Sequence, residues 1–404
     1  MSAKSFSLSS SSRQALPIIL VLGAITIMPP LATDMYLSAF PQMAEHFNVS
    51  GGEIELSLSL FVIGMALGQI IYGPMADRFG RKMPLMLGIG LFALSSILIV
   101  FATDAYSFIG LRLLQAIGGC AGMVISRAII DDLFSPIEGA RVLSTMMLIT
   151  GIGPILAPII GSYLLTLAGW QSIFVVLFIF SVACLIATHL SLNETLPKGE
   201  RVNQSLAGVM RVFWQLMTTR GFIVPALAGS IAFGGLFAFI AGSPRVFMTV
   251  FGFSQTSYGW LFALNAAGMI VGAQLNRFLL NRLPMLTMLK AGMLSYMLFA
   301  SALLLVANGQ SILAFMIPLV LCIAHIPIIM ANATALAMSS SGANSGSASA
   351  LLGVMQFGIA GIVSAIVGIF DNGTAIPMAI IIAATALFAL LVFYISNRNL
   401  PSSN

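Results

Sequence analysis

The sequence predicts an all-α integral membrane protein that crosses the bilayer twelve times, as two six-helix bundles. First, its 404 residues are 59% hydrophobic and only 7% charged, with a mean hydropathy of +1.05. These values lie far outside the range of soluble globular domains. Second, the apolar residues fall in runs of at least about 18, which is long enough for a helix to cross a bilayer core of about 30 Å. Lipid is therefore the predicted solvent.

Twelve apolar runs meet this length. They cover residues 15–38, 54–74, 83–102, 106–129, 140–165, 170–192, 221–243, 256–280, 285–307, 311–338, 346–369 and 374–396. An even number of spans places both termini on the same side of the membrane.

The basic residues predict which side that is. All of the 17 Lys and Arg residues except Arg112 and Arg245 fall in or beside segments that this topology makes cytoplasmic. The opposite loops, around 41–52, 103–104 and 307–310, contain no Lys or Arg. The positive-inside rule therefore predicts cytoplasmic termini. It also explains the net charge of +5 without a nucleic-acid partner.

Composition argues against an enzyme, a metal site or a bound cofactor. Cys120, Cys184 and Cys322 lie inside apolar runs with no pairing pattern. Three histidines form no cluster with Cys or carboxylates, and no nucleophile or pair of catalytic carboxylates is apparent. The Ser-rich segment 1–12 is predicted to be a cytoplasmic tail and not a signal peptide.

The longest polar interval, residues 193–220, is the predicted cytoplasmic linker between bundles at 1–192 and 221–404. An internal repeat supports this division. Gly272–Phe278 matches Gly73–Phe79 at Gly, Arg and Phe, with Asn276 in place of Asp77. Two parallel copies of a six-helix unit predict a central cavity between them.

A charged segment follows the second run and contains Gly73, Asp77, Arg78, Gly80, Arg81 and Lys82. From its residues alone it is a charged turn that anchors two helices. Its pattern resembles the loop between helices two and three of the major facilitator superfamily. The resemblance implies the major facilitator fold, and it implies that Asp77 and Arg78 bridge helix ends across the two halves as a conformational latch.

Asp34 is a candidate functional residue in the first run, because ionisable groups at membrane depth cost several kcal/mol unless they face a cavity or a partner. One interpretation is a hydrated acid at the helix end. The other is a carboxyl group that loads and releases protons as it meets each side of the membrane.

The sequence Asp-Met-Tyr-Leu at 34–37, followed by Pro41, resembles the first helix of drug/proton antiporters of the bicyclomycin and phenicol resistance group. Ser38 stands where those proteins commonly have Pro. The resemblance implies a monomer in the bacterial inner membrane, and it implies roles in substrate binding for Asp34 and Tyr36.

Arg112 lies in the fourth run, in a stretch similar to the Arg motif of the family's fourth helix, with Ala116 where Gly is frequent. A buried Arg needs an anion or hydrogen-bond acceptors. Asp34 and Gln115 are the candidates, and an Arg that snorkels to the outer interface is the alternative. We expect Arg112 and Asp34 to couple protons together.

The fifth run carries small residues and two prolines, in a pattern that resembles the antiporter motif of the superfamily's exporters. Its residues are Gly151, Gly153, Pro154, Ala157, Pro158 and Gly161. Gly153, Ala157 and Gly161 recur every four residues, which predicts a smooth face for close helix contact, and the prolines predict kinks.

Three further ionisable residues lie in or near the predicted spans. Gly242-Ser243-Pro244-Arg245 resembles a stretch in phenicol exporters, so Arg245 is a candidate for contact with substrate or for an outer gate. His325 and Asp371 are left open as participants in proton transfer.

The predicted function is a proton-coupled antiporter that exports lipophilic drugs from the cytoplasm by alternating access. An exporter of an endogenous metabolite, such as an amino acid or a siderophore, is the alternative. A channel would need a continuous selectivity lining. The single acid and the asymmetry of the two halves argue against that class of protein.

Overall fold

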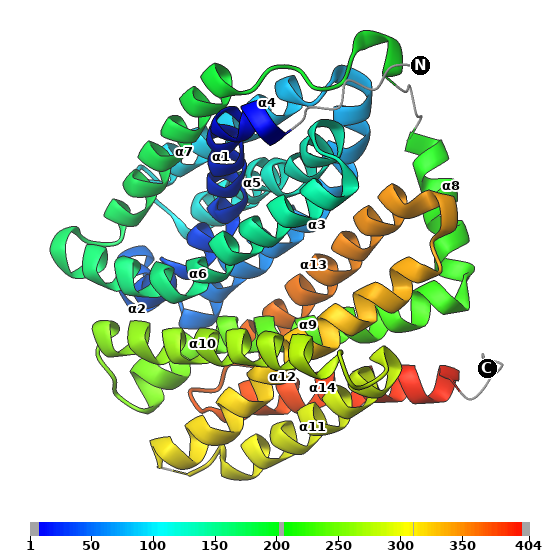
Figure 1. The fold of residues 1–404 in the computed structure, drawn as a ribbon. Coiled ribbons are helices and arrows are strands. Elements are labelled where there is room, and N and C mark those ends of the chain that lie inside the picture. The colour runs from blue at the N-terminus through cyan, green and yellow to red at the C-terminus, as the bar shows by residue number, and fades with distance from the viewer. Residues whose placement is uncertain (1–7, 202–205, 310, 398–404) are drawn as a thin grey trace.

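Helices alone build the described part of the chain, residues 8–201, 206–309 and 311–397 of a computed structural model (Figure 1). Twelve helices there are long and apolar enough to cross a membrane, which confirms the predicted number of spans. They are α1 (Leu8–Asp34), α3 (Gly51–Phe79), α4 (Lys82–Ile99), α5 (Ala105–Leu133), α6 (Pro136–Ala168), α7 (Gln171–Ser191), α9 (Arg220–Pro244), α10 (Gln255–Leu279), α11 (Met285–Val306), α12 (Ile312–Ser339), α13 (Ser345–Ile369) and α14 (Ile376–Asn397). Short elements are η1 (Leu37–Ala39), α2 (Phe40–Phe47), η2 (Lys198–Glu200), α8 (Leu206–Thr218), η3 (Arg245–Val250) and η4 (Gly342–Asn344).

The second span is longer than predicted at both ends. α3 starts at a capping box, in which Ser50 and Glu53 satisfy each other's backbone N–H groups. The predicted span ends at residue 74, but the helix continues to Phe79, since Pro74 does not end it. The turn comes at Gly80, whose φ of 93° favours glycine. A side chain there would also overlap the carboxylate of Glu194.

The first helix ends before the end of the predicted first span. α1 stops at Asp34, and the chain then turns through η1 into α2, within a stretch expected to be loop. Pro41 lies in the first turn of α2, where a missing N–H costs nothing. Asn48, with a φ of 54°, ends α2 in the left-handed conformation.

The predicted linker contains an amphipathic helix, α8, which is too short to form a membrane-spanning apolar run. Val209, Phe213 and Leu216 on its inner face pack with Phe222 and Leu351 of the second set of spans. Trp214, on the opposite face, is exposed. The linker is therefore ordered over this helix, and the proposed boundaries at 192 and 221 stay a prediction.

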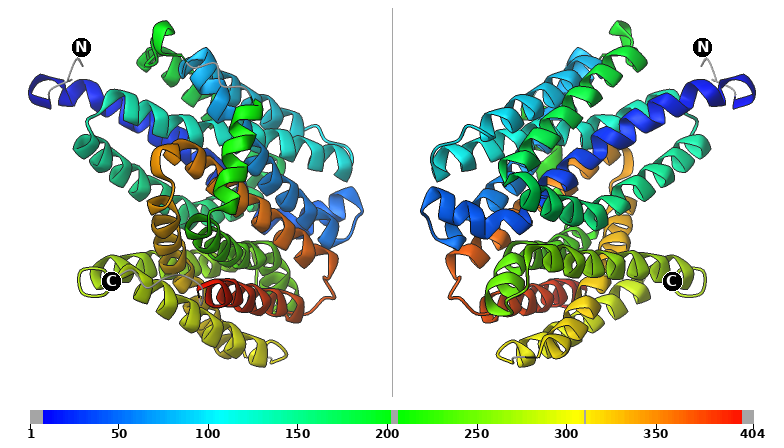
Figure 2. Two further views of the ribbon diagram at one scale, coloured as in Figure 1. Left: turned by 90° about the vertical axis from the view of Figure 1, so that its right-hand side faces the viewer. Right: turned by 90° about the vertical axis from the view of Figure 1, so that its left-hand side faces the viewer.

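The first six and last six spans meet along two pairs of helices, α3 with α13 and α6 with α10. Figure 2 shows the start of α1 and the end of α14 at the same end of the molecule. Following the predicted orientation, we call this the cytoplasmic end and the opposite one the outer end.

The halves are packed together at the outer end. A Cβ at Gly52 would overlap the carbonyl oxygen of Gly368, so α3 and α13 touch there through their backbones. Further along α3, the hydroxyl group of Ser59 donates to Ser364 Oγ of α13 at 2.9 Å.

Toward the cytoplasmic end, the ribbons of the two halves diverge in Figure 2. There α10 exposes side chains such as Val271 and Leu275. One hydrogen bond, from Arg127 to Ser349, still joins the halves on this side.

The small-residue face of α6 packs against α1. Gly153 lies against Ile27, Ala157 is fully buried, and Gly161 touches the backbone of Met35. Pro158, on another face, lies against Gly259 of α10. α6 thus contacts the first helix of its own half and the opposite half at once.

We expect Gly161→Ala to lower the thermal unfolding temperature of the detergent-solubilised protein. The added methyl group would overlap the carbonyl oxygen of Met35, and overpacking of this kind costs about 1–3 kcal/mol. Gly151→Ala is the matched control, because nothing lies within 4 Å of a Cβ at that position. Equal unfolding temperatures for the two variants would contradict the close approach of α6 and α1.

Candidate functional site

The guanidinium of Arg112 is enclosed within the first half. Its exposed fraction is 0%, and Nη2 donates to the carbonyl oxygen of Ala32 at 3.0 Å. Nη1 donates to the side-chain oxygen of Gln115. The ring centroids of Tyr36 and Phe61 each lie 4.2 Å from Cζ, which allows two cation–π contacts. Arg112 thereby joins α5 to α1, α3 and the turn after α1.

Arg112 forms no ion pair with a described residue. The expected contact with Gln115 is confirmed. The amide nitrogen Nε2 of Gln115 in turn donates a hydrogen bond to Ser96 Oγ of α4 at 2.8 Å. The predicted ion pair between Arg112 and Asp34 is wrong for this structure. The neutral hydrogen-bond acceptors and the two aromatic rings surround the guanidinium where a carboxylate was expected. Snorkelling to the outer interface is also wrong, since no part of the side chain reaches the surface.

Asp34 is the last residue of α1 and is only 4% exposed. Its Oδ1 accepts a hydrogen bond from the hydroxyl of Thr33 at 3.0 Å. The segment that follows directly, η1, contacts α9 and α10 of the second half. A hydrated acid at the membrane surface is therefore wrong for this structure. Asp34 lies instead in a buried position where the two halves meet.

Tyr36 is fully buried beside these two residues. Its hydroxyl lies 3.1 Å from Ser57 Oγ, and its ring packs against Phe40 and Phe174. The structure thus brings together Asp34, Tyr36 and Arg112, but with the outer ends closed Tyr36 faces the interior of the first half and not an open cavity.

Arg245 belongs to a different cluster. It follows α9 at the start of η3, and its Nε lies 3.3 Å from Oδ2 of Asp371. Its other nitrogens lie near Gly51 and Gly373. This position lies between the start of α3 and the turn after α13, and the role of an outer gate stays a prediction. A role in substrate binding stays a prediction.

Glu55 completes that cluster, and sequence analysis missed it. It is 2% exposed and lies on α3 near Arg245 and Asp371. The signal was present, because an acid inside a predicted span is a candidate functional group by default. Its position near the expected helix start made it resemble part of the loop.

The turn between α3 and α4 is held by a local network of charges. Arg81 contacts Asp77 at 2.5 Å and Asp132 of α5 at 3.0 Å. The backbone N–H groups of Arg81 and Lys82 donate to the carboxylate of Glu194 at 2.7 and 3.3 Å. These contacts join α3 and α5 of the first half to the start of the linker after α7.

The pKa of Glu194 reflects this arrangement. Partial burial opposes ionisation, but the N–H groups of Arg81, Leu196 and Lys82 and the charge of Arg201 outweigh it and lower the pKa below its usual value. The ionised carboxylate is therefore the form that binds this turn.

The expected latch across the halves is not among the described contacts. Asp77 pairs with Arg81, and Arg78 stacks on its neighbour Phe79. In the second copy of the motif, Asn276 accepts a hydrogen bond from Asn332 at 2.8 Å, again within its own half. A bridging role for Asp77 and Arg78 therefore stays a prediction for a state whose cytoplasmic ends are closed.

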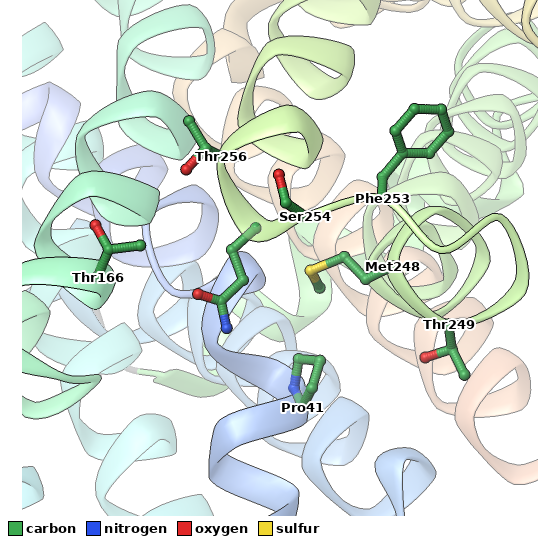
Figure 3. Close-up of a pocket in the computed structure, with 8 residues that line it drawn as sticks. Pro41, Thr166, Met248, Thr249, Phe253, Ser254 and Thr256 are labelled. Carbon is green, nitrogen blue, oxygen red and sulfur yellow. The ribbon is translucent and has the colours of Figure 1, made fainter.

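An open depression of about 570 Å³ lies at the outer end, between the halves (Figure 3). Pro41 of α2 and Thr166 of α6 form one wall. The other wall runs from Met248 to Thr256, around the turn into α10. Its lining includes none of the predicted site residues, so it is a surface groove above the closed outer end.

The family model of the Major Facilitator Superfamily matches residues 22–365. The chain belongs to this superfamily. It is therefore a multi-pass membrane protein in a family of transporters, which are not enzymes. The twelve-span architecture is that of the family.

Similar proteins cover nearly the whole chain. The MFS-type transporter YdgK of Bacillus subtilis (strain 168) is 33% identical over 391 residues, which are 95% of this chain and 96% of YdgK. A bicyclomycin resistance protein homolog of Haemophilus influenzae is 31% identical over 389 residues, 95% of this chain and 97% of the relative. Among solved structures, a D-xylose–proton symporter has a TM-score of 0.75 at 16% identity, over 93% of this chain and 97% of that one. This last similarity concerns the fold.

We expect Arg112→Lys to destabilise the protein, although the charge is kept. An ammonium group cannot stack flat on Tyr36 and Phe61 while it reaches both Ala32 and Gln115. Loss of charge-assisted hydrogen bonds costs about 1.5–3 kcal/mol each. Thermal unfolding in detergent measures the loss. Arg211→Lys, at an exposed position of α8, should unfold like the wild type. Equal losses in the two variants would contradict this account.

We expect Glu194→Gln to lower the unfolding temperature at pH 7 and to have little effect in acid. Because the pKa of Glu194 is lowered on folding, its contribution is present above the pKa of the unfolded chain, about 4.3. It is lost as pH falls through the lower folded value. The difference from the wild type should therefore shrink below pH 4. A difference that stays constant with pH would show that the carboxylate charge is not what binds the turn. Glu45→Gln, at an exposed acid on α2, is the control.

Proposed function

We propose that the chain is a proton-coupled antiporter that exports lipophilic drugs from the cytoplasm by alternating access. The observation that carries the proposal is Asp34, a buried acid at the junction of the halves with no cation among its described partners. A buried carboxylate without a cation costs several kcal/mol. The protonated acid therefore suits the state with closed outer ends.

Alternating access would change the surroundings of this acid. Rocking of the two halves around the α3–α13 and α6–α10 contacts would separate the outer ends. Because η1 contacts α9 and α10 directly after Asp34, separation would admit water to the carboxyl group. The acid would then exchange its proton with the outer side, and the reverse motion would carry the proton inward.

Arg112 is the group best placed to sense the charge of Asp34. It holds the carbonyl oxygen of Ala32, two residues before the acid, and its guanidinium has an Nε without a hydrogen-bond partner in the described structure. An ionised Asp34 would attract this cation and weaken its contacts with Tyr36 and Phe61. The proton on Asp34 would thus be coupled to the packing of α1 on α3 and α5.

The relatives support drugs as substrates. One of the similar proteins is named for bicyclomycin resistance, and the names of others describe multidrug resistance. The chain contains 24 Met and 28 Phe residues, a supply of deformable apolar side chains that suits varied lipophilic ligands. Tyr36 and Arg245 are proposed substrate contacts in states that expose them.

The remaining predictions complete this model. We propose cytoplasmic termini in a bacterial inner membrane, a monomer, and bundles at 1–192 and 221–404 joined by the 193–220 linker. The segment Gly73–Lys82 is proposed to latch the cytoplasmic ends when they close. The Gly151–Gly161 stripe supports exchange, because α6 contacts both α1, which carries the acid, and α10 of the opposite half.

We expect Asp34→Asn to fold normally and to lose proton-driven export. Asn has the shape of the protonated acid but cannot release a proton. The test is drug transport into inverted membrane vesicles under an imposed pH gradient, together with drug-induced proton release from the purified protein. Both signals should fall to background, while Glu45→Gln keeps both. Export at the wild-type rate by Asp34→Asn would remove this residue from the coupling mechanism.

The same vesicles separate the two substrate classes. Phenicols and bicyclomycin should be transported, and their transport should release protons. Transport of amino acids or siderophores without transport of drugs would favour export of a metabolite instead.

A further inference from the structure

Glu55 occupies an unusual position for an acid. It lies about one turn into α3, at the place where this helix crosses α13. Its carboxylate rests on the backbone of α13, since a Cβ at Gly368 would lie 3.4 Å from its Oε2. The side chain is therefore enclosed by the contact that closes the outer ends.

The carboxylate is incompletely paired. Oε2 of Glu55 is buried and has no hydrogen-bond partner in the described structure. Beside it is a cavity of about 10 Å³, room for about one water molecule. Its lining includes Glu55, Gly242, Arg245, Val367, Asp371 and Thr374. All of these except Glu55 belong to the second half.

The charges around this cavity do not balance when both acids are ionised. Arg245 is the cation that faces Glu55, and it already contacts Asp371 at 3.3 Å. Two carboxylates then share one guanidinium. The other elements packed on α3 supply no second cation there. On α2, the charged or titratable residues Glu45 and His46 are both exposed. On α5, Asp104 lies at the exposed start of the helix, and Arg112 is enclosed by Tyr36 and Phe61. Lys82, at the start of α4, lies at the opposite end of the molecule.

We propose that Glu55, Arg245 and Asp371 form a second proton-binding site, and that a proton on Glu55 holds the outer ends of the two halves closed. The ligand is a proton taken from water on the outer side, which forms an O–H bond with the Glu55 carboxylate. The carboxyl group can then donate to the single water molecule for which the cavity has room, and the charges of the cluster balance.

The direction follows from solvation. In the closed arrangement an ionised Glu55 would be a buried charge without a cation of its own, which costs several kcal/mol. When the outer ends separate, water reaches the carboxylate and removes this cost. Low outer pH therefore favours the closed arrangement, and high outer pH favours opening. A single proton can change the open-to-closed ratio by at most about tenfold per pH unit.

This role differs from that of Asp34. Glu55 takes up and releases its proton on the same side of the membrane, so it carries no charge across and controls when the outer ends open. The inference rests on the alternating access of the proposed function, but it requires neither a drug substrate nor coupling through Asp34.

The experiment measures the outer opening directly, without transport. Spin labels on Tyr106→Cys of α5 and Leu313→Cys of α12, both highly exposed near the outer end, report the distance between the halves. The three native cysteines are buried, which limits their labelling. Distance distributions are recorded by pulsed electron paramagnetic resonance of the full-length protein between pH 5.5 and 8.5.

We expect the labelled protein to shift from short to long distances as pH rises. Glu55→Gln, which keeps the shape of the protonated acid, should stay short throughout. Glu55→Asp should retain a pH-dependent shift, and Glu45→Gln should behave like the wild type. A wild-type protein without any shift, or an unchanged shift in Glu55→Gln, overturns the inference.

Asp34→Asn in the same labelled background separates this inference from the proposed function. A shift that survives in Asp34→Asn and disappears in Glu55→Gln supports the second site, whatever the transport assay shows. A shift that disappears in Asp34→Asn and survives in Glu55→Gln assigns the titration to Asp34. That result overturns the second site and leaves proton-coupled export standing.

Discussion

Burial of one guanidinium organises the first half of this transporter. Arg112 cannot lose its proton and has no described carboxylate partner, so the fold must satisfy it with the carbonyl of Ala32, the amide of Gln115 and the faces of Tyr36 and Phe61. Those partners come from α1, α3, α5 and the turn after α1. A displacement of any one of them would leave a buried charge unsatisfied, and this explains why the turn that carries Asp34 and Tyr36 is held so closely.

The two halves differ in how they use polar groups. The first half carries the charge network of Asp77, Arg81 and Asp132, whereas the second carries the neutral pair Asn276 and Asn332 at the corresponding place. Between the halves, at the outer end, buried acids lie at two separate points, Asp34 and Glu55. In the proposed mechanism, closure of the outer end would remove water from both carboxyl groups, so its free energy would depend on their protonation.

Part of the site could be predicted from local patterns. Asp34 and Arg112 were found because each is an isolated ionisable residue in an apolar run, and Gln115 because it lies one turn from Arg112 on the same helix. The predicted pairing of Arg112 with Asp34 is wrong, because charge alone did not reveal the aromatic rings of Tyr36, in the turn after α1, and Phe61 of α3. Glu55 was missed for a related reason. Its significance comes from Gly368, Arg245 and Asp371, which are distant in the chain and reach it only through the packing of α13 and α9 on α3.

The sequence by itself determined the number of spans and the family resemblance, because an apolar run of given length has one stable solution in lipid, a spanning helix. It did not determine where several helices end, since Gly73–Phe79 continues α3 and Phe40–Phe47 forms α2 through caps and contacts beyond the run itself. Only the tertiary structure decided which polar groups face one another across the two halves. Such contacts depend on the mutual position of α3 with α13 and α6 with α10, and hydropathy carries no information about which helices meet.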